Sequence, residues 1–146
     1  MKKNMLKVFT MLSLVVMLAA GSVWAAAEEP FKINVPFEFS AGKQVLPAGE
    51  YVVRQVFGGS VVRIQAVEGD AIATVQTHSV QSKSDQSKAR LVFRRYGDQY
   101  FLSQVFGSSD LKGRELTRSR REREFAKGNY SARLASEAEV VTVTGQ

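Results

Sequence analysis

Cysteine is absent from this 146-residue sequence, and His78 is its only histidine. Without cysteine the chain can form no disulfide, thiolate metal site, thiol nucleophile or dithiol redox motif. A single histidine cannot build a multi-histidine metal site, and the chain contains no G-x-S-x-G, phosphate-loop or H-E-x-x-H motif. We therefore expect no cofactor and no metal ion, and we assign no residue a catalytic role.

Long apolar runs are also scarce: residues 8–20 form the one clear case, and two polar residues interrupt it. Three lysines precede this run, and small residues follow it at the positions expected for cleavage after Ala25 or after Ala27. A basic start, a short apolar segment and an A-x-A-like site are typical of a secretory signal peptide. A transmembrane anchor is the weaker alternative, because a spanning helix needs about 20 apolar residues.

The excess of positive charge is small once the signal segment is set aside. The full chain has 20 basic and 14 acidic residues and a net charge of +6. Cleavage after Ala25 removes three lysines and no acid, which leaves 17 basic and 14 acidic residues and a net charge of +3. Any effect of the basic residues therefore has to be local. The remaining ~120 residues fit one domain whose core is large enough to fold without disulfides.

The chain after the signal segment consists of short β-rich stretches separated by turn signals, a pattern typical of an all-β domain. Residues 31–39 alternate between apolar and polar side chains, which predicts a half-buried strand. Pro36 lies inside this stretch and cannot donate to a ladder, so the strand is expected at a sheet edge or with a bulge. Other turns are expected at residues 46–49, Gly69-Asp70 and Gly97-Asp98, and a polar loop over residues 79–88.

Gly58 and Gly59 predict a two-residue hairpin turn, because both can adopt a positive φ. This turn sets the register of its strands and places two pairs on the core side, Val53 with Ile64 and Gln55 with Val62. On the outer side it places Arg54 directly opposite Arg63. Opposed like charges are destabilising, so we expect water and salt, a bound anion or a carboxylate from another segment to offset them.

A second hairpin is predicted around Gly97-Asp98. Its register gives two inward pairs, Phe93 with Leu102 and Arg95 with Tyr100. It also gives two outward pairs, Arg94 with Phe101 and Arg90 with Val105. Arginine opposite an aromatic residue favours a cation–π contact. The outer face is too apolar to be left exposed, so we expect another segment, such as a C-terminal helix, to cover it.

Residues 114–127 form a basic stretch between Gly113 and Gly128 that is rich in good helix formers, which predicts a helix. Two pairs spaced by four residues support it, Arg118 with Glu122 and Arg120 with Glu124. Its few apolar residues form no continuous stripe, so a membrane-surface helix is not expected. No zinc spacing, recognition helix or aromatic RNA-binding motif accompanies the arginines, so nucleic acid is not expected as a partner. The simplest interpretation is a solvated helix, and the alternative is a helix that binds a polyanion.

Three segments carry a resemblance to a known group of proteins: NVPFEFSAGKQVLPAGEYVVR, SKARLVFRRYGDQYFLSQVF and GRELTRSRREREFA. In these segments the chain resembles small exported bacterial proteins of the kind common in acidobacterial genomes, and the resemblance spans about residues 33–126. It implies export and a compact β-domain. It carries over no activity, ligand or catalytic residue, and the tail after Gly128 lies outside it.

We therefore predict one all-β domain, an antiparallel sandwich or partly open barrel of about six to seven strands with one C-terminal helix packed across it. Residues 1–25 are the predicted signal peptide. Residues 26–128 are the domain, with its helix at about residues 114–127, and residues 129–146 are a loose tail or a final edge strand.

The function expected from these features is that of an exported, non-catalytic binding or structural module of the periplasm, the cell envelope or the exterior. Its ligand is expected to be anionic, an envelope polysaccharide for example, and another protein is the alternative partner. The residues expected to meet an anion are Arg54, Arg63, Arg118, Arg120, Arg121 and Arg123. The alternative function is a small secreted glycan hydrolase that uses two paired carboxylates, drawn from Glu38, Glu50, Glu68, Asp70 and Asp98.

Overall fold

The structure, a computed structural model, describes residues 29–81, 88–108, 112–132 and 139–145. These residues form the strands β1 (Phe31–Val35), β2 (Phe39–Ala41), β3 (Gln44–Leu46), β4 (Gly49–Val56), β5 (Val61–Ala66), β6 (Ile72–Gln81), β7 (Arg90–Tyr96), β8 (Gln99–Phe106), β9 (Lys112–Leu116) and β10 (Glu139–Thr144). A 3-10 turn, η1 (Phe57–Gly59), joins β4 to β5, and the helix α2 (Arg120–Ala132) lies between β9 and β10. The predicted signal peptide, residues 1–25, lies outside the described residues.

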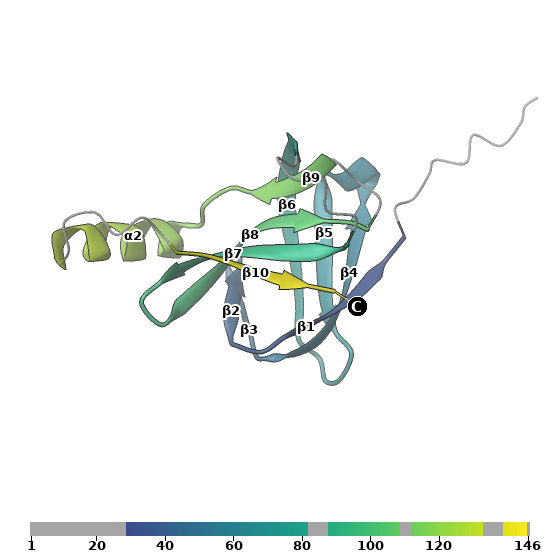
Figure 1. Cartoon of the computed structure of the whole chain (residues 1–146), viewed down its shortest axis with the longest axis horizontal. Helices are drawn as coiled ribbons and strands as arrows, with labels where there is room; N and C mark the ends of the chain where they lie inside the picture. Colours follow the sequence, from purple (N-terminus) through teal and green to yellow (C-terminus); the bar gives the residue numbers. More distant parts are fainter. Residues whose placement is uncertain (1–28, 82–87, 109–111, 133–138, 146) are drawn as a thin grey trace, which may run out of the picture.

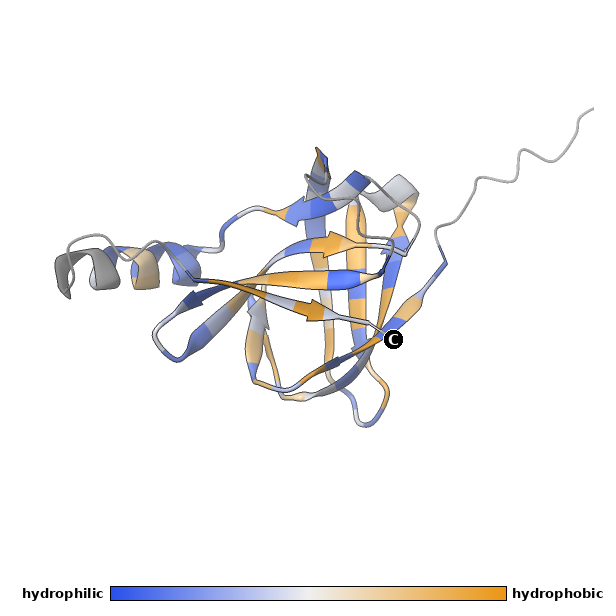
Figure 2. Ribbon diagram, in the orientation of Figure 1, coloured by the Kyte–Doolittle hydropathy of each residue, from blue (hydrophilic) through white to orange (hydrophobic). Residues whose placement is uncertain are grey.

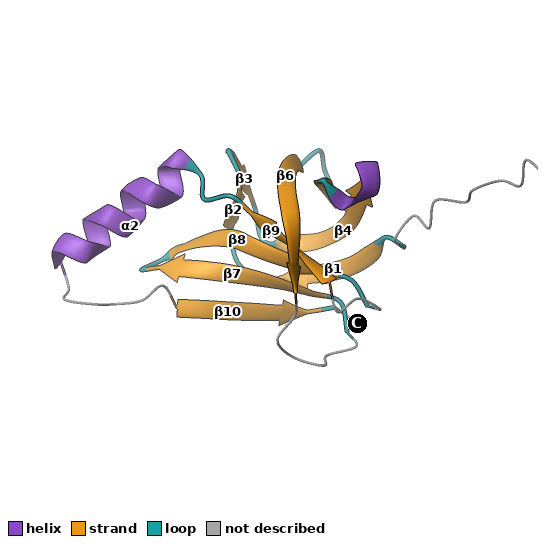
Figure 3. Cartoon of the chain, turned by 90° about the horizontal axis from the view of Figure 1, so that it is seen from above, coloured by secondary structure: helices purple, strands orange, loops and turns teal. Residues whose placement is uncertain are grey.

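All these strands belong to one mixed sheet with the order β1-β4-β5-β6-β9-β8-β2-β3, and β7 joins β10 to the opposite edge of β8. β2 runs parallel to β8, and the other strand pairs of the described residues are antiparallel. The sheet curves around its core but is not closed into a barrel (Figures 1 and 3). The expected all-β fold with a C-terminal helix is confirmed, and the sheet is larger than expected and includes one parallel pair.

The additional strands arise partly because the alternating segment at residues 31–39 is divided. β1 ends just before Pro36 and pairs with β4 at one edge of the sheet, as the proline predicts. β2 begins three residues after Pro36, and the residues of both strands that face inward are buried. Gly42, with φ +62°, turns β2 directly into β3. One predicted strand is therefore an edge strand followed by a short hairpin.

The register predicted for the first hairpin is confirmed. Val53 pairs with Ile64, Gln55 with Val62 and Arg54 with Arg63. The connection is longer than the predicted two residues, because the last ladder pair is Val56 with Val61. Its four residues are the three of η1 and Ser60, and Gly58 and Gly59 have the expected positive φ of 63° and 80°.

Arg114 of β9 bonds to the end of β4 and to the loop that contains η1. Its Nε donates to Gln55 Oε1 at 2.9 Å, and its Nη2 donates to the carbonyl oxygen of Gly58 at 3.0 Å. Thr77 Oγ1 of β6 donates to the carbonyl oxygen of Gly59 at 2.7 Å. The guanidinium also lies so close to Gly59 that a side chain there would overlap it. The polar groups of this loop therefore satisfy one another.

The second hairpin keeps its predicted register near the turn and loses it at a bulge. Phe93 faces Leu102, Arg94 faces Phe101 and Arg95 faces Tyr100, as predicted. Beyond them the register shifts, because β8 contains one extra residue, Ser103. Arg90 therefore faces Phe106, and the predicted pairing of Arg90 with Val105 is wrong. The cation–π contacts shift as well: Arg90 lies 4.0 Å from the centroid of the Phe106 ring, and Arg95 lies 5.4 Å from that of Tyr100.

The predicted bounds of the helix are wrong at both ends. The first residues of the basic stretch form β9 between β6 and β8, and α2 runs from Arg120 to Ala132. Pairing with two neighbouring strands outweighs the helix propensity of Arg114 to Leu116. The helix also does not lie across the sheet: Figure 1 shows that it extends away from the sheet beside the β7–β8 hairpin. Its first turns do cover the outer face of that hairpin, as expected, because the rings of Phe125 and Phe101 lie 5.8 Å apart.

Two further differences concern the loop and the tail. Residues 79–81, predicted to begin a polar loop, continue β6 and pair with β9, and residues 82–87 lie outside the described residues. Of the two alternatives for the tail, the final strand is confirmed: β10 pairs with β7 along its whole length. The core lies inside the curve of the sheet, where apolar residues alternate with polar ones along the strands, whereas α2 is mostly hydrophilic (Figure 2).

Two adjacent glycines allow the role of Arg114 to be tested. Gly59→Ala is expected to destabilise the protein by about 3 kcal/mol, because a side chain at positive φ is strained and the new methyl group displaces the Arg114 guanidinium. Gly58→Ala is the control, since Gly58 also has a positive φ but has no atom near its Cβ position. Its expected cost is about 1 kcal/mol. Urea denaturation measures both values, and equal losses would show that Arg114 does not fix this loop.

Candidate functional site: a basic groove between the sheet and the helix

An open groove of about 720 Å³ lies where α2 leaves the sheet. Three segments line it: the turn between β2 and β3, the first half of β6, and the chain from the end of β9 into the first turns of α2. Figure 3 shows the start of α2 on the same side of the sheet as β2 and β3. We refer to this feature as the groove. Because its walls come from distant parts of the sequence, it exists in the folded protein alone.

The groove has an apolar floor and a mainly basic rim. Ala41, Val75 and Leu116 belong to the buried core and form the floor. The rim carries three cations and one acid: Lys43, Arg120, Arg121 and Glu124. Arg120 Nε lies 3.0 Å from Glu124 Oε1, so this acid is already paired with one of the cations. An apolar floor with a few polar groups at its rim is the usual composition of a ligand site, and here the charge favours an anion.

Backbone groups of β6 add hydrogen-bonding capacity to the groove. The N–H of Thr77 and the carbonyl oxygen of Ala71 both bond to the chain on the β5 side. Because alternate residues of a strand face opposite neighbours, the backbone groups of Thr74 and Gln76 point to the other side, into the groove. β9 pairs with that side of β6 from Thr77 onward, and no described strand pairs with residues 72–76 there.

The position of α2, and with it one wall of the groove, depends on the buried side chain of Glu122. Ser119 begins the helix by accepting a hydrogen bond from the backbone N–H of Glu122 at 3.1 Å. The Glu122 carboxylate turns to the sheet, where Arg94 Nε of β7 donates to it at 2.6 Å. The Glu122 and Arg94 side chains are 3% and 13% exposed, so this ion pair is largely shielded from water.

Tyr96 completes the contact between α2 and the sheet. Its hydroxyl donates to Glu122 Oε1 at 3.4 Å. Burial raises the pKa of Tyr96 above its ordinary value, and the negative charge of Glu122 raises it further. The hydroxyl therefore keeps its proton and acts as a donor to the carboxylate.

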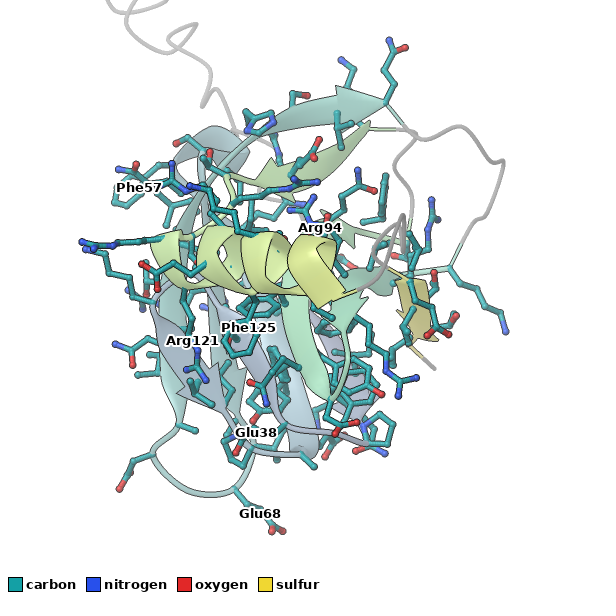
Figure 4. The ribbon with its side chains drawn as sticks, turned by 90° about the vertical axis from the view of Figure 1, so that its left-hand side faces the viewer. Glu38, Phe57, Glu68, Arg94, Arg121 and Phe125 are labelled. Atoms are coloured by element: carbon teal, nitrogen blue, oxygen red, sulfur yellow. The ribbon has the colours of Figure 1, made fainter. Side chains whose placement is uncertain are left out.

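Arg121 is held at the groove by the second hairpin. Its Nη2 donates to Gln99 Oε1 at 3.3 Å, and its guanidinium lies 5.8 Å from the centroid of the Phe125 ring. In Figure 4, Arg121 and Phe125 lie on the same side of α2. The guanidinium is therefore positioned before any ligand binds.

The arginines predicted to meet an anion fall into three groups. Arg120 and Arg121 line the groove. Arg118 precedes α2 and lies 3.9 Å from Glu122 Oε1, and the side chain of Arg123 is exposed outside the groove. The other two, Arg54 and Arg63, lie on the outer face of β4 and β5.

Arg54 and Arg63 form an exposed pair of like charges. They are directly opposed in the ladder, as predicted, and no described side chain forms a hydrogen bond or an ion pair with either guanidinium. A carboxylate from another described segment therefore does not offset their repulsion. The next residue in the same cross-strand row is Thr74, which lines the groove. The row Arg54–Arg63–Thr74 thus leads across the outer face into the groove.

Sequence reasoning missed Lys43 and the two glutamines of the groove, Gln44 and Gln76. The signal for Lys43 was present: Gly42 and Lys43 separate two β-rich stretches, as a two-residue hairpin turn does. Nothing local indicates that this turn faces β6 and α2.

The carboxylates considered for hydrolysis are exposed and have no polar partner in the described residues. Glu50 and Glu68 do line a second, smaller pocket of about 310 Å³ together with Tyr51. In Figure 4, Glu38 lies below α2 and Glu68 lies at the lower edge of the molecule. His78 lies within β6, 59% exposed, with its Nε2 3.7 Å from Glu115 Oε2.

No family model, curated protein or solved structure matches the chain. Within the residues that the structure describes, no helix is long and apolar enough to cross a membrane. The same residues contain no cluster of three histidine, aspartate or glutamate side chains that could hold a metal ion.

The placement of α2 can be tested with two substitutions of the same type. Glu122→Gln is expected to cost about 3 kcal/mol, because it leaves the guanidinium of Arg94 without its buried countercharge. Glu124→Gln is the control: its ion pair with Arg120 is exposed, and the expected cost is below about 0.5 kcal/mol. Urea denaturation of both variants measures the difference. Similar small losses in both would show that Glu122 does not anchor the helix.

Proposed function

We propose that this chain is an exported, non-catalytic binding module that holds an acidic polysaccharide of the cell envelope along its outer surface. The observation that supports the proposal best is the row Arg54–Arg63–Thr74, which joins to the groove two arginines that have no partner among the described residues. We call the cations along this path, Lys43, Arg54, Arg63, Arg120 and Arg121, the basic track.

The shape of the basic track favours a chain-like ligand over a small ion. Neighbouring residues of a cross-strand row lie about 5 Å apart, so the row alone spans roughly 10 Å before it reaches the groove. Neither Arg54 nor Arg63 is enclosed, and an exposed charge contributes little to binding by itself. A polymer with repeated negative charges engages several such groups at once, and the weak contacts then reinforce one another.

The groove supplies hydrogen-bonding groups and an apolar surface, which Arg54 and Arg63 do not provide. Hydroxyl groups of a sugar can bond to the backbone groups of Thr74 and Gln76 and to the side chain of Gln44, while the less polar face of the sugar packs on Val75. Carboxylates of an acidic sugar can pair with Lys43 and Arg121 at the rim. A neutral glycan would use the same hydrogen bonds without the ion pairs, so it is expected to bind more weakly.

Export is part of the proposal and rests on the sequence of residues 1–27. The chain produced with its own N-terminus in a bacterial host is expected to be recovered outside the cytoplasm with a mass that lacks either 25 or 27 residues. Mass spectrometry of the fractionated protein distinguishes the two cleavage sites. A full-length mass in the membrane fraction would favour the uncleaved anchor instead.

Binding to the basic track is tested with polygalacturonate as the acidic polymer and dextran as the neutral one. Calorimetry at low salt is expected to show binding to polygalacturonate that weakens at moderate salt. The double variant Arg54→Ser and Arg63→Ser is expected to lose at least about tenfold in affinity and to fold normally, since it removes an opposed like-charge pair. Lys43→Gln is expected to weaken binding as well.

Lys112→Gln is the matched control, because Lys112 is exposed at the end of β9 that lies away from the groove. The same loss of affinity in this control would reduce the effect to net charge and contradict a localised track. The hydrolase alternative predicts that the polymer is shortened, and that Glu50→Gln or Glu68→Gln abolishes the shortening. Release of reducing ends that depends on either carboxylate would overturn the non-catalytic assignment.

A further inference from the structure

Phe57 combines two properties that proteins usually avoid. The residue is 83% exposed, and its backbone has a φ of +52°, the left-handed region that favours glycine. Every other positive φ in the described residues belongs to a glycine. A bulky residue in this conformation is strained, and strain of this kind is found where a side chain has a task. Figure 4 shows Phe57 at the periphery of the molecule.

The loop around Phe57 holds its conformation through a series of bonded carbonyl groups. The carbonyl oxygen of Phe57 accepts a bond from Ser60 Oγ at 2.7 Å, that of Gly58 from Arg114, and that of Gly59 from Thr77. The backbone N–H of Thr77 donates to the carbonyl oxygen of Ser60 at 2.9 Å. The ring of Phe57 is therefore displayed from a fixed backbone, and fixing it in a complex costs little further entropy.

Phe57 lies beside one end of the basic track. Phe57 directly follows Val56, and the pair of Val56 with Val61 is the last pair between β4 and β5. Arg54 and Arg63 form the next row on the outer face, so the backbone of Phe57 lies three residues, or about 10 Å, from that of Arg54. Because Phe57 is 83% exposed, its ring is open to solvent and to a ligand.

We infer that Phe57 is a stacking platform for a sugar ring of the polysaccharide that occupies the basic track. This inference rests on the proposed function and narrows the ligand to a polymer whose repeating unit presents the C–H face of a sugar ring as well as a carboxylate. An aromatic ring gains dispersion contacts from such a face, and the hydroxyl groups of the sugar stay in water. An acidic peptide or a free anion has no flat face to offer.

The position of the ring favours a polysaccharide over a membrane. Arg54 and Arg63 lie along the wall of the curved sheet, whereas Phe57 lies at its end, beyond the last ladder pair. A flat bilayer that met the tip of the loop would not meet the arginines of the wall at the same time. A flexible polymer that follows the wall can reach both.

The variant Phe57→Asn separates the role of the ring from folding. Asparagine accepts a left-handed backbone readily, so the midpoint of thermal unfolding is expected to stay the same or to rise. Affinity for polygalacturonate is expected to fall at least about fivefold. The dependence of affinity on salt is expected to stay unchanged, because no charge is removed, in contrast to the double arginine variant.

Phe57→Trp supplies a direct signal. Trp24 is the only tryptophan of the chain and lies in the predicted signal peptide, so the chain from residue 26, which contains every described residue, would carry the new tryptophan alone. Its affinity is expected to match that of the unchanged protein, and its emission is expected to shift to the blue when polygalacturonate binds.

Four results decide the matter. Weaker binding by Phe57→Asn together with the emission shift supports the platform. Unchanged binding by Phe57→Asn, with loss in the double arginine variant, overturns the platform and leaves the proposed function standing. No binding of polygalacturonate by the unchanged protein overturns both the platform and the proposed function. An emission shift with vesicles of phosphatidylglycerol, and none with the polymer, overturns the platform in favour of a lipid surface.

Discussion

The ion pair between Arg94 and Glu122 determines where the helix lies, and the groove depends on the helix. Both side chains are largely buried, and detachment of α2 would remove the nearest countercharge of Arg94. The pair belongs to a row of ionisable side chains on the outer face, since Arg94 Nη1 lies 3.8 Å from Glu115 and Glu115 lies 3.7 Å from His78. Arg94 Nη2 is buried and has no hydrogen-bond partner among the described residues. A pair of this kind adds more to the definition of one helix position than to stability.

The fixed position of α2 explains how a mostly polar helix can shape a binding site. Its polar surface gives it little apolar area to bury, and among the described side chains Phe125 makes its aromatic contact with the sheet, at Phe101. The ion pair of Glu122 with Arg94 fixes the position of α2, which apolar packing alone would not fix. One residue before it, Arg121 then points to Gln99 and the groove, and two residues after it, Glu124 pairs with Arg120 at the rim.

Much of the sheet could be predicted, because glycine turns fix the register of neighbouring strands. The positions of Gly58 and Gly59 were enough to place Arg54 opposite Arg63. The register predicted for the second hairpin was wrong beyond Phe93, because β8 has a bulge at Ser103. The bulge places Val105 in the core, and no pattern in the local sequence indicates it. Pairing between distant strands also misled the interpretation of residues 114–116, which have helix propensity but lie between β6 and β8. The sequence Ser119-x-x-Glu122 was the better helix-start signal.

The candidate site was predictable in its charges and not in its shape. Arg120 and Arg121 were identified from composition, but the groove needs Lys43 and Thr74 as well, and these belong to segments far from α2 in the sequence. Which strand leaves an edge free is a property of the whole sheet: β6 has room at Thr74 because β9 pairs with it from Thr77 onward. No pattern within one segment carries that information.

The anchoring of the loop that contains η1 also explains how a strained residue persists there. Arg114 and Thr77 hold the carbonyl groups of Gly58 and Gly59 from two different strands, so the conformation of the loop is fixed from outside it. The strain at Phe57 is then offset by contacts that Phe57 does not make itself. A loop that had to be stable on its own would place glycine or asparagine at this position. Because the anchoring side chains come from the interior of β6 and β9, the outer surface of the loop is left free to present an aromatic ring. One side of the loop is thus held in place by β6 and β9, and the opposite side presents the Phe57 ring.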